Sequence, residues 1–590
     1  MSTIENEPTK PAAQTAEDPA ASAPLASAPT PKASWLLHLA ILIPLALGLF
    51  LFQLGQADWE DDSESCGGQI MQEMVSGHGW ILPLRNGRHM PVKPPLFYWL
   101  GALSARARHS GVDLLDARLP SALLATLGLV IVYLYTRRVA GASVALWASL
   151  ILVTTPQFII EARNSRVDMA FCVLLTAALF LAHQVWEGEA GRRAAVLAGL
   201  CLGLAALSKG PLAFALAVLV MLPLAIVAPP FPTWRALLAP ATLITAVVVP
   251  GLWYAAATVQ QGWAFLRLHV YTENVGRLLG EQGHFPLWWY VEPLFTGGLP
   301  WTIALPAAVP MESAVPQRTR RFLWLWTVAM FVFFSLSPGK RRAYLVMVRP
   351  ALAILLAGWL VPQLARLRQT PRPATVPRSV HVVIGLVIGV GLLCILGLRM
   401  GIGGFGTAET AWSHWWRQYL LEETRVAVTL VIGVAIGAEL MARWISQRRF
   451  EWAAGAFVGT LALGLGIGIS AGAIVRGSGA SFRPFAERLA TQVDVTQPLA
   501  FFDVDDETAI ALLFHLRRHV AVVSPRDAEH SCEPPTAGLY LVGERAWEAR
   551  ACFRDERWHA IEHGGPLVQS QQWRRLVLAR YDATRSVSDR

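Results

Sequence analysis

Five carboxylates stand within seven residues where the first long apolar stretch of the chain ends, in the run DWEDDSES from Asp58 to Ser65. One interpretation is acid–base chemistry, in which one or two of these acids orient or deprotonate a reacting group. The alternative is plain solvation, which accounts for most of the five. A second acid, Asp168, follows Arg163 and Arg166 in EARNSRVDMAF, where apolar residues resume. It is either a helix N-terminal cap or a second acid of the same site.

The elements that must position these acids are membrane helices. Of the 590 residues, 54% are hydrophobic and only 15% are charged, and the mean hydropathy is +0.42. A soluble globular domain carries about 25% charged residues. The apolar residues come in blocks of roughly twenty, which match the ~30 Å hydrocarbon core of a bilayer. The sequence therefore predicts a mainly α, multi-pass transmembrane helical bundle.

Arginine collects in alternate loops between these blocks, and cytoplasmic loops hold the excess of Arg and Lys. This bias places the N-terminus inside and, with an odd number of spans, places 56–116, 258–287, the turn at 338–343 and the C-terminal hundred residues outside. The net charge of +9 then reflects topology and indicates no nucleic-acid partner. About thirteen spans are predicted, at 35–55, 117–136, 142–161, 169–186, 194–208, 211–229, 236–257, 288–310, 321–337, 344–363, 379–400, 424–443 and 451–475.

Composition divides the chain into three parts. Residues 1–34 are rich in Ala, Pro, Ser and Thr and should form a disordered cytoplasmic tail. Residues 35–475 form the transmembrane domain, and residues 476–590 a small soluble extracytoplasmic α/β domain. In this last part PLAFFDV and GLYLVG are typical of buried strands, and DETAIALLFHLRRH is typical of an amphipathic helix.

The C-terminal part holds two features with open alternatives. Its acids Asp503, Asp505 and Asp506 follow an apolar strand and either bind a cation or substrate or are solvated. Cys532 and Cys552 either form a disulfide or remain free thiols.

The first outer segment, 56–116, is too long for an idle turn. Within it QIMQEMV predicts a short surface helix with Ile70, Met74 and Val75 facing inward. The stretch KPPLFYWLGAL is apolar but only a dozen residues long, so it should lie along the membrane interface. We therefore expect a carboxylate site walled by interfacial helices.

Several basic residues fall in the predicted outer segments, against the usual bias. Cations at the outer membrane face suit a bound anion, of which a lipid phosphate is the obvious one. The alternative is that they only reach toward the headgroups. They are Lys93, Arg163, Arg166, Lys209, Arg277, Lys340, Arg341 and Arg342.

The order of these motifs resembles the bacterial branch of the protein O-mannosyltransferase superfamily, which includes the lipid A aminoarabinose transferases. These are membrane glycosyltransferases of the GT-C class that use polyprenyl-phosphate sugars. The matching pieces run from about 50 to 355, and together they are highly specific. After the acidic motif they are QEMVSGHGWILP with KPPLFYWL, RNSRVDMAF, ALSKGPLAF, PGLWYAAA with YTENVGRLL, GHFPLWWYVEPLFTGGLPW and SPGKRRAYLVMVRPALAILLA.

The resemblance implies roles for particular residues. The family's first essential acid falls on Asp61 or Asp62, of which Asp62 is favoured, and its second acid falls on Asp168. The ligands of the donor phosphate fall on Lys93, Arg277 and Tyr344, with Lys340 in a recurring motif. The remaining residues expected to line the substrate pocket are Glu64, Arg166, Lys209, Glu273 and His284.

Two of these positions keep alternatives. In the aminoarabinose transferases a His follows the Glu of the loop motif and helps to bind zinc, whereas Asn274 follows Glu273 here. No metal ligand is therefore predicted, and a divalent metal is left open as cofactor. The stretch GHFPLWWY, with His284 beside Trp288 and Trp289, forms either an aromatic belt at the interface or a wall of the sugar site.

The expected activity is transfer, with inversion, of a sugar from a polyprenyl-phosphate donor at the outer face of a bacterial inner membrane. The acceptor would be a glycolipid such as lipid A, a polysaccharide or a protein, and membrane lipids would surround the enzyme. The competing interpretation is a transporter or flippase of an anionic lipid-linked solute. Transporters often show internal repeats and ionisable residues near the middle of their spans, which this sequence lacks.

Overall fold

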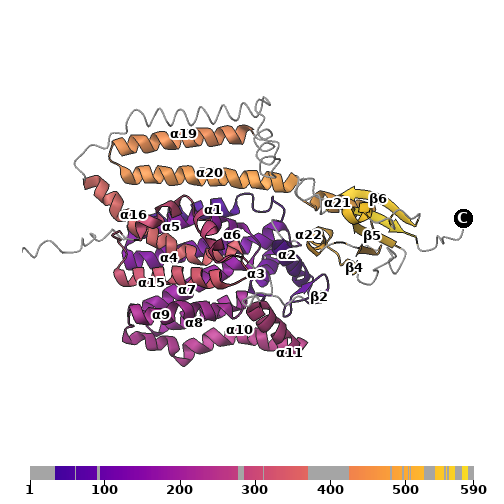
Figure 1. Cartoon of the computed structure of the whole chain (residues 1–590), viewed down its shortest axis with the longest axis horizontal. Coiled ribbons are helices and arrows are strands. Elements are labelled where there is room, and N and C mark those ends of the chain that lie inside the picture. The colour runs from indigo at the N-terminus through magenta and orange to yellow at the C-terminus, as the bar shows by residue number, and fades with distance from the viewer. Residues whose placement is uncertain are drawn as a thin grey trace, which may run out of the picture.

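The computed structural model of the chain shows a bundle of long helices that carries a smaller sheet at one end (Figure 1). It describes residues 34–59, 62–89, 93–109, 111–276, 285–309, 311–369, 424–478, 481–494, 497–502, 504, 506–523, 538–549, 553, 557–564 and 575–582. Of the predicted tail at 1–34, only Ser34 is among the described residues. The predicted span at 379–400 lies outside them, as do Asp503, Asp505, Cys532 and Cys552.

Most helices of the bundle run side by side along the horizontal axis of Figure 1. The bundle consists of α1 (Ser34–Leu51), α4 (Leu114–Ala140), α5 (Ala142–Val153), the short α6 (Pro156–Arg163), α7 (Val167–Trp186), α8 (Arg192–Lys209), α9 (Leu212–Val227), α10 (Pro240–Gln261), α15 (Gln317–Leu336), α16 (Arg349–Gln369), α19 (Thr424–Ser446) and α20 (Phe450–Ser478). Short 3-10 helices precede two of them, η2 (Pro232–Leu238) before α10 and η6 (Arg342–Val348) before α16.

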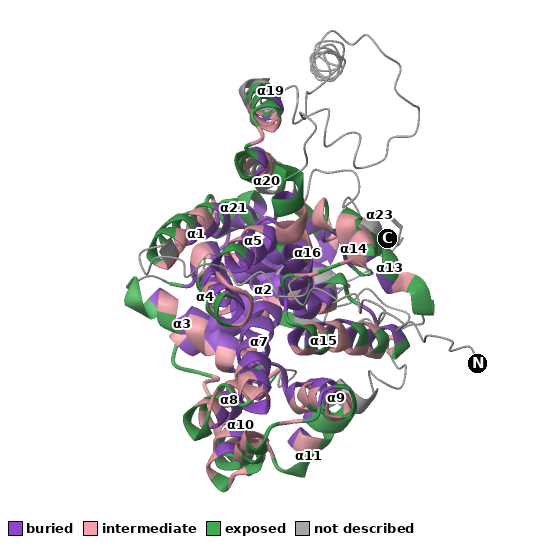
Figure 2. Ribbon diagram, turned by 90° about the vertical axis from the view of Figure 1, so that its left-hand side faces the viewer, coloured by how far each residue is buried: buried purple, intermediate pink, exposed green. Residues whose placement is uncertain are grey.

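The core of the bundle lies around α4, α5, α7 and α16, where Figure 2 shows mostly buried residues. In the most apolar stretch of α7, 78% of the residues are buried inside the protein, whereas in that of α20 only 11% are buried. Exposed apolar side chains on α10 and α20, such as Leu252 and Trp452, suit a hydrocarbon surrounding rather than water. The protein is a multi-pass membrane protein.

Among the described residues, six helices are long and apolar enough to cross a membrane, or seven if the bent pair α5 and α6 counts as one span. The bend between them is 63°. Two further apolar helices, α1 and α9, are shorter. The count of thirteen spans thus remains a prediction.

The predicted continuous helix over 288–310 is wrong. The chain there forms four short helices instead, namely η4 (Leu287–Tyr290), α13 (Val291–Thr296), η5 (Trp301–Ala304) and α14 (Leu305–Ala308). Proline lacks the N–H that continues an α-helix and clashes with the preceding turn. Because Pro293, Pro300 and Pro306 recur through this apolar segment, its hydropathy resembles a span while its backbone is broken.

The first outer segment contains the two predicted helices, α2 (Asp62–Val75) and α3 (Leu96–Ala107). Ile70 and Met74 are buried as expected, and Val75 is half-buried. Between the helices lies a hairpin of β1 (Leu84–Arg85) and β2 (Arg88–His89), which sequence analysis missed. Its two-residue turn has positive φ at Asn86 (51°) and Gly87 (71°), and Asn-Gly is the usual signal for such a turn.

The C-terminal part contains a five-stranded sheet in the order β4-β3-β5-β7-β6. The strands are β3 (Leu499–Phe502), β4 (Ala521–Val523), β5 (Gly538–Gly543), β6 (Trp558–Gly564) and β7 (Leu576–Tyr581). The first three are parallel, and β7 joins β5 and β6 in antiparallel pairs. The helices of this part are α21 (Arg483–Gln492), α22 (Asp506–Leu516) and α23 (Glu544–Ala549). The two predicted strands and the predicted helix are confirmed.

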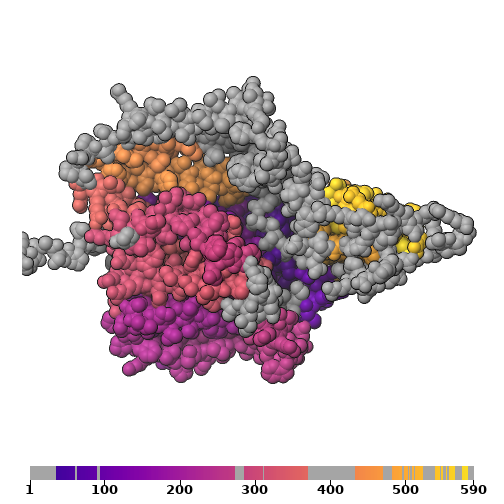
Figure 3. Space-filling view, in the orientation of Figure 1, coloured from indigo at the N-terminus to yellow at the C-terminus, as the bar shows by residue number. Residues whose placement is uncertain are grey.

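Helix α22 attaches the sheet to the first outer segment by packing on α2. Figure 3 shows this segment, in violet, between the bundle and the orange and yellow C-terminal part. His515 Nε2 lies 3.0 Å from Asp58 Oδ1, and the Phe514 ring meets the Trp59 ring at a centroid distance of 4.6 Å. Residues more than 450 positions apart in sequence thus meet at Asp58.

This junction should weaken in acid. Burial raises the pKa of Asp58, but the hydrogen bond and charge of His515, with hydrogen bonds from Ser481 and the Trp59 N–H, outweigh it, and the net pKa is lowered. A lowered pKa stabilises the folded protein above the unfolded-state value, about 3.9, and the stabilisation is lost as pH falls through the folded value. We therefore expect the thermal midpoint, followed by tryptophan fluorescence in detergent, to fall more between pH 7 and 3 in the wild type than in Asp58→Asn. Equal falls would contradict the assignment.

Candidate active site

A cavity of about 600 Å³ opens at the end of the bundle where the first outer segment lies. Its walls come from the start of α2, the end of α6, the broken helices η4 and α13, and the turn between α15 and η6. Four cationic side chains and several polar ones face it. The lining residues are Ser63, Gln157, Ile160, Glu161, Asn164, Arg166, Trp289, Pro293, Thr296, Gly297, Lys340, Arg341, Arg342 and Ala343.

Arg341 is a cation of this cavity whose backbone and guanidinium both have hydrogen-bond partners. Its backbone N–H donates to the Tyr290 hydroxyl, which donates to the Arg341 carbonyl, both at 3.2 Å. Its guanidinium donates to Ser63 Oγ at 2.9 Å. Trp289 lines the cavity whereas Trp288 is exposed, so both alternatives for the aromatic stretch stay open.

Lys340 also lines the cavity, but its ammonium already donates hydrogen bonds to backbone carbonyls. Its Nζ donates to the carbonyls of Phe334 (3.4 Å), Ser335 and Ser337 (2.8 Å), which lie at the C-terminal end of α15. A cation is favoured at that end of a helix, where carbonyls lack partners. Burial also lowers the pKa of Lys340. Of the basic trio, Arg341 is therefore better placed than Lys340 for an anion in the cavity.

Asp168 and Lys209 form a buried ion pair beside the cavity. The Lys209 ammonium also lies 4.5 Å from the centre of the Tyr344 ring, within cation–π distance. Asp168 is in the first turn of α7, and Lys209 is the last residue of α8, where Gly210 ends the helix with φ of 82°. Arg166 and Arg341 lie close enough to interact with the Asp168 charge. Four predicted site residues, Asp168, Lys209, Tyr344 and Arg166, thus gather here.

Lys93 lies at the same end of the molecule. Leu96 and Trp99, which follow it in α3, pack in one cluster with Leu207, two residues before Lys209. The Lys93 charge also acts on His269, which lies in the helix η3 (Arg267–Gly276) after the short α11 (Trp263–Leu266). Burial, with this charge, lowers the pKa of His269 to about 3, so the imidazole is neutral near pH 7. Helix η3, which ends one residue before the predicted Arg277 in sequence, therefore has His269 close to Lys93.

Glu64 does not line this cavity, although it was expected in the pocket. Its carboxylate is fully buried and accepts from Arg118 Nε (2.7 Å) and Nη2 (2.9 Å) and from the Ser165 N–H (2.8 Å). Arg118 also donates to the carbonyls of Leu54, Ala57 and Asp58. Glu64 thus anchors α2 to the bundle, because both of its carboxylate oxygens accept hydrogen bonds from residues of other elements.

Sequence reasoning missed Arg118 and Arg349, two buried arginines that shape the site. Arg349 donates to Gln157 Oε1 (2.7 Å) and to the carbonyls of Pro293 and Leu294 (2.9 Å each), so it holds two cavity walls together. Both residues fall within predicted spans. An ionisable residue inside a membrane span is expensive and usually paired, which is the signal that identifies them.

Several predicted site residues lie outside the described residues. These are Asp61, Arg277 and His284, and for Asp62, Glu273 and Asn274 only the backbone is described. Within the part of the chain that the structure describes, no three His, Cys, Asp or Glu side chains gather closely enough to hold a metal ion.

Residues 92–254 match the family described as dolichyl-phosphate-mannose-protein mannosyltransferase. The chain is 32% identical over 348 residues to undecaprenyl phosphate-alpha-4-amino-4-deoxy-L-arabinose arabinosyl transferase 1 of Pseudomonas fluorescens, which covers 55% of this chain and 60% of the relative. The undecaprenyl phosphate-alpha-4-amino-4-deoxy-L-arabinose arabinosyl transferase of Edwardsiella ictaluri is 26% identical over 421 residues, 69% of this chain and 72% of the relative. The match to the Pseudomonas enzyme thus spans only three fifths of its length.

The fold is similar to that of a solved structure. The crystal structure of ArnT from Cupriavidus metallidurans bound to undecaprenyl phosphate superposes with a TM-score of 0.71 and 20% identity, over 93% of this chain and 98% of that one. At this identity the likeness carries the fold and not the substrate. The family match, the sequence relatives and the fold agree with the resemblance of this chain to the GT-C membrane glycosyltransferases that include the protein O-mannosyltransferases and the aminoarabinose transferases.

Proposed function

We propose that the protein transfers a sugar from a polyprenyl-phosphate carrier to an acceptor at the outer face of a bacterial inner membrane. The observation that carries this proposal is the cavity lined by Arg166, Arg341 and Arg342, with the Asp168–Lys209 pair beside it. Cations in a partly apolar cavity bind an anionic leaving group more strongly than in water. The sequence relatives are named for an undecaprenyl-phosphate sugar donor, which supports the same carrier here.

The proposed topology has about thirteen spans, of which the one at 288–310 is broken into short helices, with a cytoplasmic N-terminus, a catalytic part over 35–475 and an extracytoplasmic C-terminal domain over 476–590. The basic inside loops support it, because positive residues favour the cytoplasmic side. The first outer segment and the sheet lie together at one end of the bundle (Figure 1), and Ser63 of that segment lines the cavity. In this topology that end is extracytoplasmic, where acceptors such as lipid A, a polysaccharide or a protein are accessible.

The proposed reaction is a displacement at the anomeric carbon. The acceptor oxygen forms a bond to this carbon while the bond to the phosphate oxygen breaks, so the configuration inverts. The acceptor proton passes to a carboxylate, either from the Asp61–Asp62 pair or from Asp168. The bond electrons leave with the polyprenyl phosphate, whose charge is held by Arg341 and, as the family resemblance implies, by Lys93, Arg277 and Tyr344.

The Asp168–Lys209 pair suggests a division of labour between the acids. Because the Asp168 carboxylate already accepts from Lys209, it is suited to orient this ammonium toward the phosphate. The acid at 61–62 then remains as the group that accepts the proton. Ser63, next in sequence, contacts Arg341 at the cavity, which supports this placement.

Purified protein with a radiolabelled undecaprenyl-phosphate sugar tests the proposal, and 4-amino-4-deoxy-L-arabinose is the first sugar to try. We expect label to move to an acceptor such as lipid A, with release of undecaprenyl phosphate. Uptake of the labelled lipid by vesicles without bond cleavage would instead indicate a transporter. Mass spectrometry of envelope glycolipids and glycoproteins with and without the protein identifies the natural acceptor, and a parallel assay with chelator determines whether a divalent metal assists.

A further inference from the structure

The start of α2 is fixed from two directions. On the bundle side, Arg118 and the Ser165 N–H hold the Glu64 carboxylate. On the other side, the C-terminal part holds Asp58, whose two carboxylate oxygens meet His515 Nε2 at 3.0 Å and the Ser481 hydroxyl. Both sets of contacts are buried. The side chains of His515 and Asp58 are 8% and 9% exposed, and those of Arg118 and Glu64 are 3% and 0% exposed.

Trp59 fills the space between these two anchor points. Its ring is packed against Phe514 and lies 5.4 Å from the Arg118 guanidinium. A Cβ at Gly68 of α2 would come within 2.8 Å of the Trp59 ring and 2.9 Å of Phe514, so only glycine allows this approach. The packing leaves the segment little room to shift while α22 stays in place.

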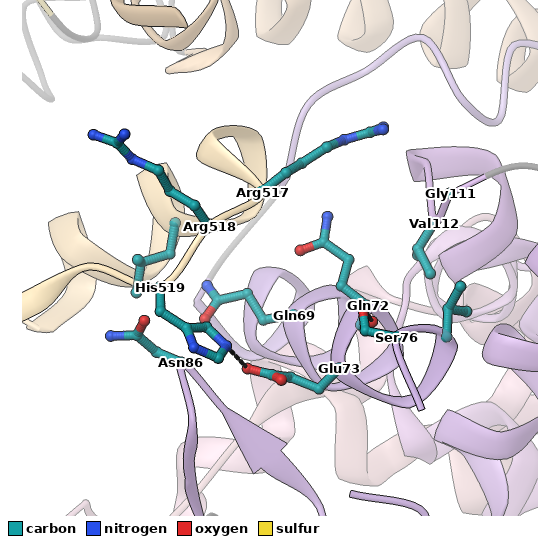
Figure 4. A pocket seen from close by; sticks show the side chains of 12 residues that line it. Gln69, Gln72, Glu73, Ser76, Asn86, Gly111, Val112, Arg517, Arg518 and His519 are labelled. Carbon is teal, nitrogen blue, oxygen red and sulfur yellow. Dashed lines mark hydrogen bonds and ion pairs between the residues drawn. The ribbon is translucent and has the colours of Figure 1, made fainter. Parts of the chain in front are cut away.

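Further contacts extend the same attachment along α2. His519 Nε2 lies 2.8 Å from Glu73 Oε1, as Figure 4 shows, and Asn86 exchanges two hydrogen bonds with the Val520 backbone (2.7 and 2.9 Å). These contacts border a cavity of about 180 Å³ between α2 and the turn at 517–519. The C-terminal part therefore contacts the segment just before α2, at Asp58 and Trp59, and the last turn of α2, at Glu73.

We propose that His515 and Asp58 are positioning residues, through which the C-terminal part holds the first turn of α2 at the active-site cavity. The link to the cavity is Ser63, which lines it and accepts from Arg341 at 2.9 Å. This inference rests on the proposed function, because it assigns the C-terminal domain a role in the same reaction. Neither residue touches a reacting atom in this scheme.

Hydrogen exchange measured by mass spectrometry on the full-length protein in detergent tests the proposal, together with the kinetics of sugar transfer. We expect His515→Ala to increase amide exchange in peptides that contain Trp59 and the first turn of α2. It should lower kcat about 10- to 100-fold, because small misplacements of reacting groups have effects of this size. KM for the donor should change much less than kcat, because Lys93, Arg277 and Tyr344 lie outside α2 and the remaining proposed phosphate ligand, Arg341, contacts it through Ser63.

Two matched variants separate positioning from general loss of structure. His515→Gln keeps a donor near the position of Nε2 and should restore both slow exchange and kcat. His559→Ala removes an imidazole of β6 that lies 3.6 Å from Asp582, and should leave amide exchange and kcat unchanged.

The proposal is overturned if His515→Ala leaves exchange at Trp59 and α2 unaltered, or if exchange rises while kcat stays at the wild-type value. It is also overturned if His515→Gln exchanges as fast as the Ala variant. A wild-type protein that transfers no sugar would refute the proposed function instead, whereas the exchange comparison would still show whether His515 holds α2.

Discussion

Replacing Asp168 by Asn is expected to lower kcat of sugar transfer by about 10²-fold, because the carboxylate that orients the Lys209 ammonium is lost and small misplacements of a reacting or charge-stabilising group have effects of this size. Asparagine has nearly the same shape as aspartate but neither accepts a proton nor pairs with the Lys209 ammonium, which is only 7% exposed. Affinity for undecaprenyl phosphate should persist, because the cations remain. The measurement is steady-state transfer from the labelled donor alongside donor binding.

The opposing interpretation is that Asp168 only complements the N-terminal end of α7. Such a charge contributes about 0.3–1 kcal/mol to stability and nothing to the chemical step. Under it, Asp168→Asn would melt slightly earlier and transfer sugar at the wild-type rate. Asp113→Asn is the matched control, since Asp113 caps α4 away from the cavity and Asn caps equally well.

A double variant keeps the test decisive if the unpaired Lys209 ammonium destabilises Asp168→Asn. Changing Lys209 to Met as well removes the buried charge and should restore folding but not transfer. Asp62→Asn is expected to reduce kcat to a similar extent, and wild-type rates for both single Asn variants would reject the assignment of these acids.

Replacing Arg118 by Met is expected to destabilise the protein by about 3–5 kcal/mol, the usual loss when one partner of a buried ion pair is removed. The Glu64 carboxylate is fully buried and would lose its charged partner, and three backbone carbonyls would lose a donor. Chemical denaturation in mixed micelles, followed by tryptophan fluorescence, measures the change.

Two further variants define the cause. Adding Glu64→Gln to Arg118→Met removes the stranded charge and should recover part of the loss. Arg483→Met breaks an ion pair whose side chains are 59% and 64% exposed and should change stability by less than about 1 kcal/mol. If Arg118→Met is no more harmful than Arg483→Met, the buried pair is not the anchor of α2 that we infer.

Local patterns in the sequence were sufficient for much of the architecture. Apolar blocks indicated α7, α10 and α16, and short apolar runs indicated β3 and β5, because burial of a long segment depends on its own composition. The pattern failed at 288–310, where prolines break a segment whose hydropathy suits a span. Hydropathy measures transfer to lipid and contains no term for the backbone.

The residues of the candidate site likewise fall into those that the sequence predicted and those that only the structure revealed. The motif order placed Asp168, Lys209, Tyr344 and Arg166 in one site, and the structure brings them together. The sequence did not reveal that Lys340 is bound by carbonyls of α15 while Arg341 faces Ser63. These two residues are adjacent and chemically alike, so only the direction in which the turn projects each side chain separates them.

By itself, therefore, the sequence determined a helical membrane protein with acids and cations gathered at one end. Only the tertiary structure decided that Glu64 is an anchor, that Arg118 and Arg349 brace the walls, and that His515 reaches Asp58. The physical reason is range. Hydrophobic periodicity acts over neighbouring turns, whereas a charge finds its partner by distance in space, which sequence separation does not indicate.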